Sequence, residues 1–183
     1  MKTLKIASLA FLFLGLVGCS SELKWKTDSS SGYYTIDVPE RMVSTFELHD
    51  EATTQYEYVE QDGSTVKEHY VIVLMETKES IDALGLDFEF DAISYSELSV
   101  QALEGGLSSS NILTKERKIE NVNGIECCKV EMEGSANGIN VYYQIAIFEG
   151  EKAFYQVVTW TLQDQKEEFK PIMEKMLASF KEV

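Results

Sequence analysis

The fold is decided by residues 123–162, NGIECCKVEMEGSANGINVYYQIAIFEGEKAFYQVVTWTL. Apolar and polar residues alternate along much of this stretch, and Asn123-Gly124, Asn137-Gly138 and Glu149-Gly150 interrupt it. Asn-Gly between two alternating segments is a strong signal for a tight β-hairpin turn, because both residues tolerate a positive φ. The stretch therefore predicts an antiparallel meander with strands over residues 125–133, 139–148 and 153–162.

Outside the meander, strands are predicted over residues 23–26, 33–38, 45–48, 53–60, 65–76 and 112–119. Asp62-Gly63 separates two alternating segments and predicts a hairpin. Pro39 should end the strand before it, since proline has no N–H to donate to a neighbouring strand. The run Val71-Ile72-Val73-Leu74-Met75 is apolar on both faces, which indicates a central strand covered on both sides.

Two segments follow the helical period of 3.6 residues instead. The first segment ends at Gly105-Gly106. Apolar or small residues lie on one side of this predicted helix, and they are Phe90, Ile93, Ser96, Val100, Leu103 and Leu107. The second is the amphipathic C-terminal segment, with Phe169, Ile172, Met173, Met176, Leu177 and Phe180 on its apolar face. Pro171 favours a helix that starts near Lys170 or has an irregular first turn, and Asp164 with Glu167 resembles a capping box.

This order of elements predicts an α+β fold, a mostly antiparallel sheet flanked by helices. Three segments carry a resemblance to a known family: GYYTIDVP at 32–39, YQVV at 155–158, and FKPIMEKMLASFK at 169–181. They resemble the Mog1/PsbP-like α/β/α sandwiches, from the opening strand to the closing Ser-Phe-Lys. Arg41-Met42 depart from the pattern, since many members place a tryptophan after the proline.

The resemblance implies a binding or assembly role, because few members of that family have any attributed catalysis. Members include a photosystem extrinsic subunit, a partner of a nuclear-transport GTPase and many bacterial lipoproteins. The shared motifs are structural, so the resemblance assigns no site residue and no cofactor to this chain.

The N-terminus has the organisation of a bacterial lipoprotein signal. Lys2 and Lys5 precede an apolar run over residues 6–18. A membrane-spanning helix needs about 20 apolar residues, so this run is too short to span a bilayer. The run ends in Leu16-Val17-Gly18-Cys19, which looks like a lipobox. We therefore expect cleavage between Gly18 and Cys19, with lipid attached to the Cys19 sulfur.

The chain then divides into a signal peptide at 1–18, a short lipidated tether at 19–22 and one domain at 23–183. Two or more acyl chains on one cysteine would hold the domain firmly to a bilayer. Ser20 lacks the aspartate type of inner-membrane retention signal, which in a two-membrane cell would favour the outer membrane. The expected location is therefore the cell membrane or, in such a cell, the outer membrane, on the extracytoplasmic side.

The chain is strongly acidic, with a net charge of −15. Removal of Lys2 and Lys5 with the signal leaves 14 basic against 31 acidic side chains, a net charge of −17. Such a body repels phosphate backbones, which argues against nucleic acid as a partner. Membrane contact would come from the lipid on Cys19.

Cys127 and Cys128 are adjacent, and neighbours in a strand point to opposite faces, which disfavours a disulfide between them. Cys128 shares a face with Val130 and Met132 and should lie in the core, whereas Cys127 shares the wetter face with Lys129 and other charged residues. The spacing is not that of a zinc or redox motif, so no metal is expected, and the redox state stays open.

No pattern in the chain indicates catalysis. His49 is predicted near a turn and His69 on a strand, without a nucleophile motif beside either. Asp87-Phe88-Glu89-Phe90-Asp91 fails as a calcium loop, because Ala92 replaces the required glycine and Leu98 the required glutamate. These acidic residues are better explained at a helix N-terminus.

Tyr56 and Tyr58, like Tyr142 and Tyr143, are interpreted first as sheet packing and second as a binding patch. The sequence thus favours a lipid-anchored, extracytoplasmic binding or assembly module with an envelope protein as partner. The alternatives are a hydrolase with a non-contiguous site that includes His49 or His69, and a carrier of a small apolar ligand.

The lipid anchor is directly testable. The N-terminal peptide of the mature protein should begin at Cys19 and carry the mass of acyl chains, and Cys19→Ala should move the protein from the membrane to the aqueous fraction. Cys127→Ala, which keeps Cys19, serves as the control and should stay membrane-bound. An N-terminal peptide without fatty acid on that sulfur would contradict the anchor.

Overall fold

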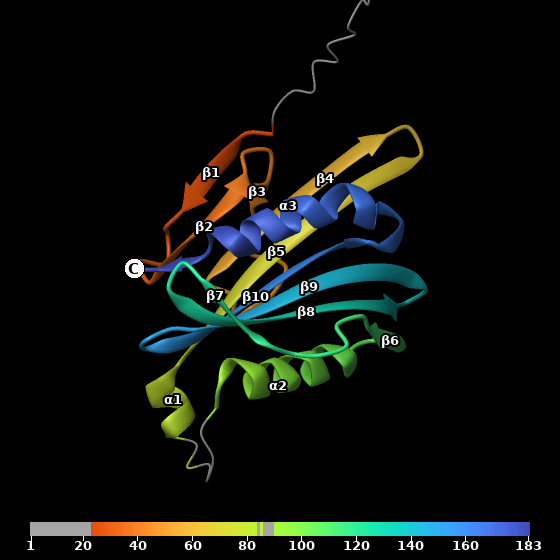
Figure 1. Ribbon diagram of the computed structural model, residues 1–183. Helices are drawn as coiled ribbons and strands as arrows, with labels where there is room; N and C mark the ends of the chain where they lie inside the picture. Colours follow the sequence, from red (N-terminus) through yellow and green to blue (C-terminus); the bar gives the residue numbers. More distant parts are fainter. Residues whose placement is uncertain (1–22, 84, 86–89) are drawn as a thin grey trace, which may run out of the picture.

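The computed structural model describes residues 23–83, 85 and 90–183, and its middle layer is an eight-stranded antiparallel sheet (Figure 1). The predicted signal peptide and tether, with Gly18 and Cys19, lie outside the described residues. The strand order along the sheet is β3 (Val43–Ser44), β4 (Thr54–Asp62), β5 (Thr65–Thr77), β10 (Ala153–Leu162), β9 (Ile139–Glu149), β8 (Ile125–Ala136) and β6 (Ser109–Ile112), with β7 (Ile119–Val122) also paired to β8.

Two outer layers cover this sheet. One face carries the helix α2 (Ala92–Glu104) and the short α1 (Lys78–Asp82). The other face carries α3 (Lys166–Ser179) beside a small sheet of β1 (Trp25–Asp28), β2 (Tyr34–Pro39) and β11 (Lys181–Glu182) (Figure 1). The predicted α/β/α sandwich with a mostly antiparallel sheet is confirmed. Within the described part of the chain, no helix is both long and apolar enough to cross a membrane.

The predicted meander is present as β8, β9 and β10. Asn123 and Asn137 both have a φ of 53°, followed by glycines at positive φ, which is the backbone of a type I′ hairpin turn. The turn at Asn137-Gly138 sets the register, because it pairs Ala136 with Ile139 and every later pair follows from that one. The Asp62-Gly63 hairpin between β4 and β5 is also present, and β2 ends at Pro39 as predicted.

The centre of the sheet is buried on both faces, as the apolar run in β5 predicts. Val71 and Val73 pack on the side of α3, in a cluster with Phe148 and Phe180. Ile72 packs on the side of α2, in a second cluster. These two sides are called the α3 face and the α2 face below.

The prediction for Cys127 is wrong in one respect. Cys128 lies on the α2 face with Val130 and Met132, as expected, but Cys127 is fully buried too. The layer of α3 and β2 covers the face that sequence alternation marked as wet. Burial raises the pKa of the Cys127 thiol to about 12, so this thiol is protonated and inert at neutral pH. Both cysteines are free.

Two predicted strands are also wrong. Residues 45–48 form a loop, because the side-chain oxygen of Gln55 accepts hydrogen bonds from the N–H groups of Leu48 and His49. Residues 112–119 break into the ends of β6 and β7, since the N–H groups of Leu113 and Thr114 both bond to the Glu131 carbonyl. Strand β6 begins before the predicted strand, because Ser109 and Ser110 also belong to it.

Helix α2 follows the predicted pattern. Val100 and Ser96 are buried against the sheet, and the helix ends at Gly105. Asp91 caps its N-terminus by accepting a hydrogen bond from the Ser94 N–H at 2.7 Å. The other acidic residues predicted there, Asp87 and Glu89, lie outside the described residues.

Helix α3 starts earlier than predicted. A 3₁₀ turn at Gln163–Gln165 precedes Lys166, and Pro171 lies inside the helix on its exposed side, where water can bond the carbonyl that proline leaves free. The late start at Lys170 is therefore wrong, although the irregular turn in front is present. The Asp164 capping box is wrong as well, because the N-cap is Gln165 without a side-chain hydrogen bond.

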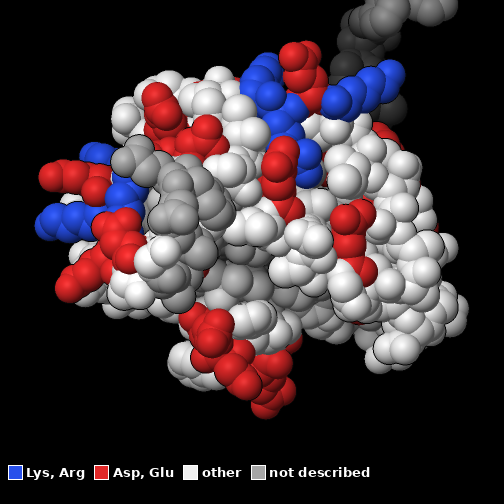
Figure 2. Space-filling view, turned by 90° about the horizontal axis from the view of Figure 1, so that it is seen from below, with Lys and Arg blue, Asp and Glu red and all other residues white. Residues whose placement is uncertain are grey.

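Figure 2 shows the face that carries α1 and α2. Acidic side chains protrude at several places, and lysine and arginine side chains gather in two groups that have acidic neighbours. The excess of acid expected from the composition is thus spread over this surface.

The fold predicts a large effect at Phe180, the residue that ends α3. Its fully buried ring stacks on Phe148 with a centroid distance of 4.2 Å and also contacts Tyr34 and Tyr155. Phe180→Ala should lower the free energy of unfolding by about 3–5 kcal/mol in urea denaturation. Phe46→Ala, at a side chain that is 86 % exposed, should change it by less than about 0.5 kcal/mol. Equal effects would mean that α3 is not docked through Phe180.

A candidate binding cavity beneath helix α3

Polar side chains interrupt the α3 face of the sheet where β8 and β9 pass beneath α3. The pairing of these strands places Glu131 opposite Gln144 and Glu133 opposite Tyr142. Tyr142 is fully buried, and Gln144 is 3 % exposed. Buried polar groups need hydrogen-bond partners, so a partner is expected for each polar atom of these side chains.

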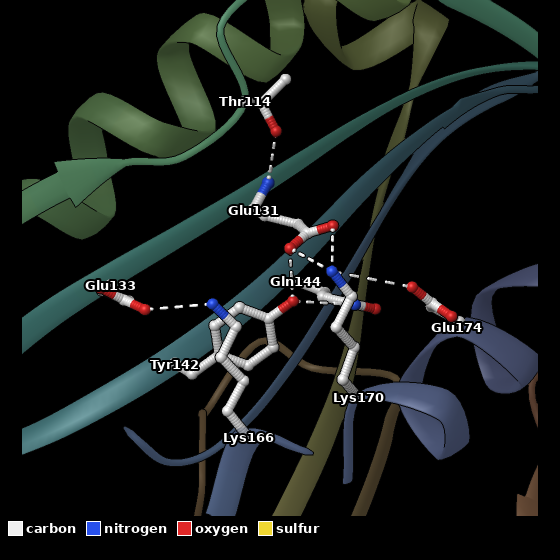
Figure 3. A network of polar contacts seen from close by, with 8 residues as sticks. All are labelled: Thr114, Glu131, Glu133, Tyr142, Gln144, Lys166, Lys170 and Glu174. Atoms are coloured by element: carbon white, nitrogen blue, oxygen red, sulfur yellow. Dashed lines mark hydrogen bonds and ion pairs between the residues drawn. The ribbon is translucent and has the colours of Figure 1, made fainter. Parts of the chain in front are cut away.

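Glu131 is the centre of the network (Figure 3). The ammonium group of Lys170, from α3, donates to both of its carboxylate oxygens at 2.9 and 2.8 Å. The Tyr142 hydroxyl donates to Oε2 at 2.7 Å, and the Glu131 N–H donates to the Thr114 hydroxyl at 2.8 Å. A second lysine of α3, Lys166, bonds Glu133 at 3.1 Å and lies over the Tyr142 ring. Two ion pairs thus fasten α3 to the sheet.

The ionisation states in this network follow from its geometry. Burial alone would raise the pKa of Glu131, but the hydrogen bonds from Lys170 and Tyr142 outweigh it and lower this pKa. The bond to Glu131 raises the pKa of Lys170. Burial, with the bond to the Glu131 carboxylate, raises the pKa of Tyr142. At neutral pH the network therefore holds a carboxylate, an ammonium and a neutral phenol.

These states fix the orientation of the Gln144 amide. Tyr142 has one hydroxyl proton, and the hydrogen bond to Glu131 uses it. Toward Gln144 the hydroxyl can therefore only accept a hydrogen bond. The partner at 3.0 Å must then be the amide nitrogen of Gln144, and its oxygen points away from Tyr142 (Figure 3). This oxygen, Oε1, is buried and has no hydrogen-bond partner among the described residues.

Among the described residues, one other buried side-chain atom lacks a partner, Nε of Arg117. Its guanidinium lies 3.8 Å from the Glu97 carboxylate, so the charge at that place is balanced. At Gln144 the case is different, because the atom is a neutral acceptor on a residue that lines a cavity.

The cavity has a volume of about 320 Å³ and lies between α3 and strands β8 and β9. Its side-chain walls come from Lys129, Glu131, Gln144, Glu174, Leu177 and Ala178. Val130 and Ile145 also line it, and they contribute main chain because their side chains pack on the α2 face. We call this space the α3 cavity.

The charges around the α3 cavity are mostly paired. Lys170 neutralises Glu131, and the ammonium of Lys129 lies 3.2 Å from Glu120 on β7. Glu174 is the exception, since its nearest cation is Lys170 at 3.9 Å and its side chain is 56 % exposed. Gln144, a buried residue with an unpaired acceptor, therefore lines the α3 cavity at what we call its buried end, and Glu174, an exposed and loosely paired carboxylate, lines it at its solvent end.

The two histidines lie on opposite faces of the sheet. His69 is buried on the α3 face, where its Nε2 lies 2.8 Å from the Thr159 hydroxyl and its ring packs on Phe169. Burial lowers the pKa of His69 to about 3, so the ring is neutral. His49 lies in the loop before β4, whose Leu48 packs on the α2 face, and its Nδ1 accepts from the Glu51 N–H. The structure does not bring the two together.

The aromatic pairs are packing residues. Tyr56 and Tyr58 pack partly buried on the α3 face, and Tyr142 and Tyr143 are buried. Arg41, at the departure from the family pattern, stacks on the Tyr58 ring with its guanidinium 4.1 Å from the centroid. Among the described residues, no group of three or more His, Cys, Asp or Glu side chains could hold a metal ion.

The sequence pattern does not single out the residues around the α3 cavity. It places Glu131 among the charged residues on the polar face of its strand. A signal was available, however. The Asn137-Gly138 turn fixes the pairing of Glu131 with Gln144, and on β9 Gln144 alternates with apolar residues that face the same way. A glutamine within such a face indicates a functional or network position.

Comparison with known proteins yields structural likeness alone. The sequence matches no protein-family model and no curated protein. The fold is similar to that of CyanoP, a cyanobacterial PsbP from Synechocystis, with a TM-score of 0.59 and 14 % identity over 92 % of this chain and 96 % of that one. This likeness confirms the PsbP-like fold.

Two further structures share the fold. LpqN of Mycobacterium tuberculosis, a protein involved in cell envelope biogenesis, gives a TM-score of 0.55 and 11 % identity over 90 % of this chain and 87 % of that one. A Pseudomonas aeruginosa protein of unknown function gives 0.53 and 10 % identity over 85 % of this chain and 94 % of that one. At these identities the likeness concerns architecture.

The unpaired oxygen predicts an unusual result for Gln144→Leu. The change removes a buried unpaired acceptor, which costs about 1–3 kcal/mol, and loses one hydrogen bond to Tyr142 worth about 1 kcal/mol. Urea unfolding should show a stability equal to or above that of the unmodified protein.

The matched control is Gln55→Leu. Gln55 is 5 % exposed, accepts two backbone N–H groups and donates to the His49 carbonyl, so all its groups are paired. This variant should lose at least about 1 kcal/mol. A comparable loss for Gln144→Leu would mean that Oε1 is satisfied in solution, and the α3 cavity would then lack its distinguishing feature.

Proposed function

We propose that this protein is a lipid-anchored, extracytoplasmic module that binds another component of the cell envelope through the α3 cavity and performs no chemistry on it. The single observation that carries the proposal is the unpaired, buried side-chain oxygen of Gln144, a residue that lines that cavity. An acceptor held without a partner in an otherwise satisfied network is a cost to the fold that a bound donor would remove.

The envelope location is supported by the sequence signal at Gly18 and Cys19. The fold shared with LpqN, itself involved in envelope biogenesis, agrees with this placement. The acidity of the chain, −15 overall, supports a partner that is neither nucleic acid nor the anionic bilayer surface itself. The lipid on Cys19 would supply the membrane contact.

Binding is favoured over hydrolysis by the state of the histidines. A general base must lie within reach of its nucleophile and titrate near the working pH. His69 is buried and neutral with a pKa of about 3, and it contacts Thr159 and Phe169 inside the core. His49 lies in a loop on the other side of the sheet. These positions favour structural roles for both.

The α3 cavity also disfavours a carrier of apolar ligands. Its volume of about 320 Å³ is at the lower end of the range for small-molecule sites, and Glu131, Gln144 and Glu174 form much of its wall. An apolar guest would leave the Gln144 oxygen unpaired and would remove water from the Glu174 carboxylate. A protein side chain with donor groups fits the same space better.

Site-specific photo-crosslinking in intact cells tests the proposal. A short diazirine side chain at Ala178, which lines the α3 cavity and is exposed, should capture one discrete envelope component. The same side chain at Gln101, exposed on α2 at the opposite face, is the matched control and should capture none. The Ala178 adduct should weaken at least tenfold when Gln144→Leu is added.

Three results would contradict the proposal: no adduct at Ala178, equal adducts at Ala178 and Gln101, or an Ala178 adduct that Gln144→Leu leaves unchanged. Expression and membrane location of each variant are checked in parallel, so that a loss of adduct is separated from a loss of protein.

A further inference from the structure

We infer that the guest of the α3 cavity is a basic side chain, lysine or arginine, of a partner protein. This inference rests on the proposed function and names the chemistry of the partner. It follows from the groups at the buried end of the α3 cavity, the charge at its solvent end and the apolar wall between them.

The buried end requires a hydrogen-bond donor. The lone pairs of Gln144 Oε1 accept and cannot donate, and the amide cannot turn over, because the hydroxyl proton of Tyr142 is already used in the hydrogen bond to Glu131. A carboxylate, phosphate or carbonyl guest would place acceptor against acceptor. Guests with N–H or O–H groups remain.

The solvent end selects a cation among these donors. Lys170 and Lys129 are each held by a carboxylate, Glu131 and Glu120 respectively, so neither leaves a free positive charge in the α3 cavity. Glu174 has its nearest cation at 3.9 Å and faces the same space. An ammonium or guanidinium could donate to Gln144 Oε1 and gain the attraction of Glu174.

The wall between the two ends suits an alkyl stem. Leu177 and Ala178 of α3 supply apolar surface along the α3 cavity. Lysine and arginine carry three or four methylenes behind the charged head, and such stems bury readily on apolar surface. The negative charge of the whole chain would also speed the approach of a basic partner.

The test uses the purified, lipidated protein in mild detergent and two probes that differ in one group. N-acetyl-lysine methylamide carries the ammonium, and N-acetyl-norleucine methylamide has a similar stem without it. Titration followed by NMR should shift the Gln144 side-chain amide and the Ala178 methyl with the lysine probe, at a dissociation constant in the millimolar range. The norleucine probe should bind at least tenfold more weakly.

Variants assign the effect to the two recognition groups. Gln144→Leu should abolish the shifts at Ala178, and Glu174→Gln should weaken the lysine probe several-fold, with part of the salt dependence lost. Glu97→Gln, which removes a carboxylate of α2 on the other face of the sheet, should leave binding unchanged. Equal binding of the two probes, or an unchanged affinity in Gln144→Leu, would overturn the inference.

The two proposals fail in different ways. If Ala178 forms an adduct but the lysine and norleucine probes bind equally, the inference of a basic guest is rejected and the proposed binding site is kept. The absence of any Ala178 adduct removes the proposed function itself. A crosslinked peptide whose residue in the α3 cavity is neither lysine nor arginine overturns the inference made here.

Discussion

The structure depends on burial of the central strands on both faces. β5, β10, β9 and β8 lie between α2 on one side and the layer of α3 with the small sheet on the other, so nearly every side chain on them needs a packed or bonded partner. Apolar residues meet this requirement along most of the sheet. Where β8 and β9 run beneath α3, the residues are polar, and the requirement must be met by hydrogen bonds and ion pairs.

These polar residues beneath α3 therefore hold the helix on the sheet and also form the candidate site. Lys166 and Lys170 reach down from α3 to the carboxylates of Glu133 and Glu131, and Tyr142 closes the network between them. A fully satisfied network of this kind fixes the position of a helix, whereas one unpaired member marks a place where function has outweighed stability. Gln144 is that member, and in the proposed function its buried oxygen accepts a hydrogen bond from the bound partner.

The local features of the fold could be predicted from sequence, and those that depend on distant coverage could not. The turn at Asn137-Gly138 is predictable because two adjacent residues determine it, and the same turn implies the pairing of Glu131 with Gln144.

The burial of Cys127 is not predictable in this way. Alternation along the strand places Cys127 on the polar face, and it does not reveal that a helix some forty residues away along the chain covers that face. The role of Lys170 was hidden for the same reason, since its contact with Glu131 joins α3 to β8. The loop at 45–48 escaped prediction because one side chain, Gln55, holds it.

The most direct measurement is a crystal structure of the protein with N-acetyl-lysine methylamide at a resolution that shows ordered water. The ammonium nitrogen should lie in the α3 cavity, about 3 Å from Gln144 Oε1 and on the side of Glu174. A well-ordered water bonded to Oε1, with the probe elsewhere or not bound, would contradict this prediction.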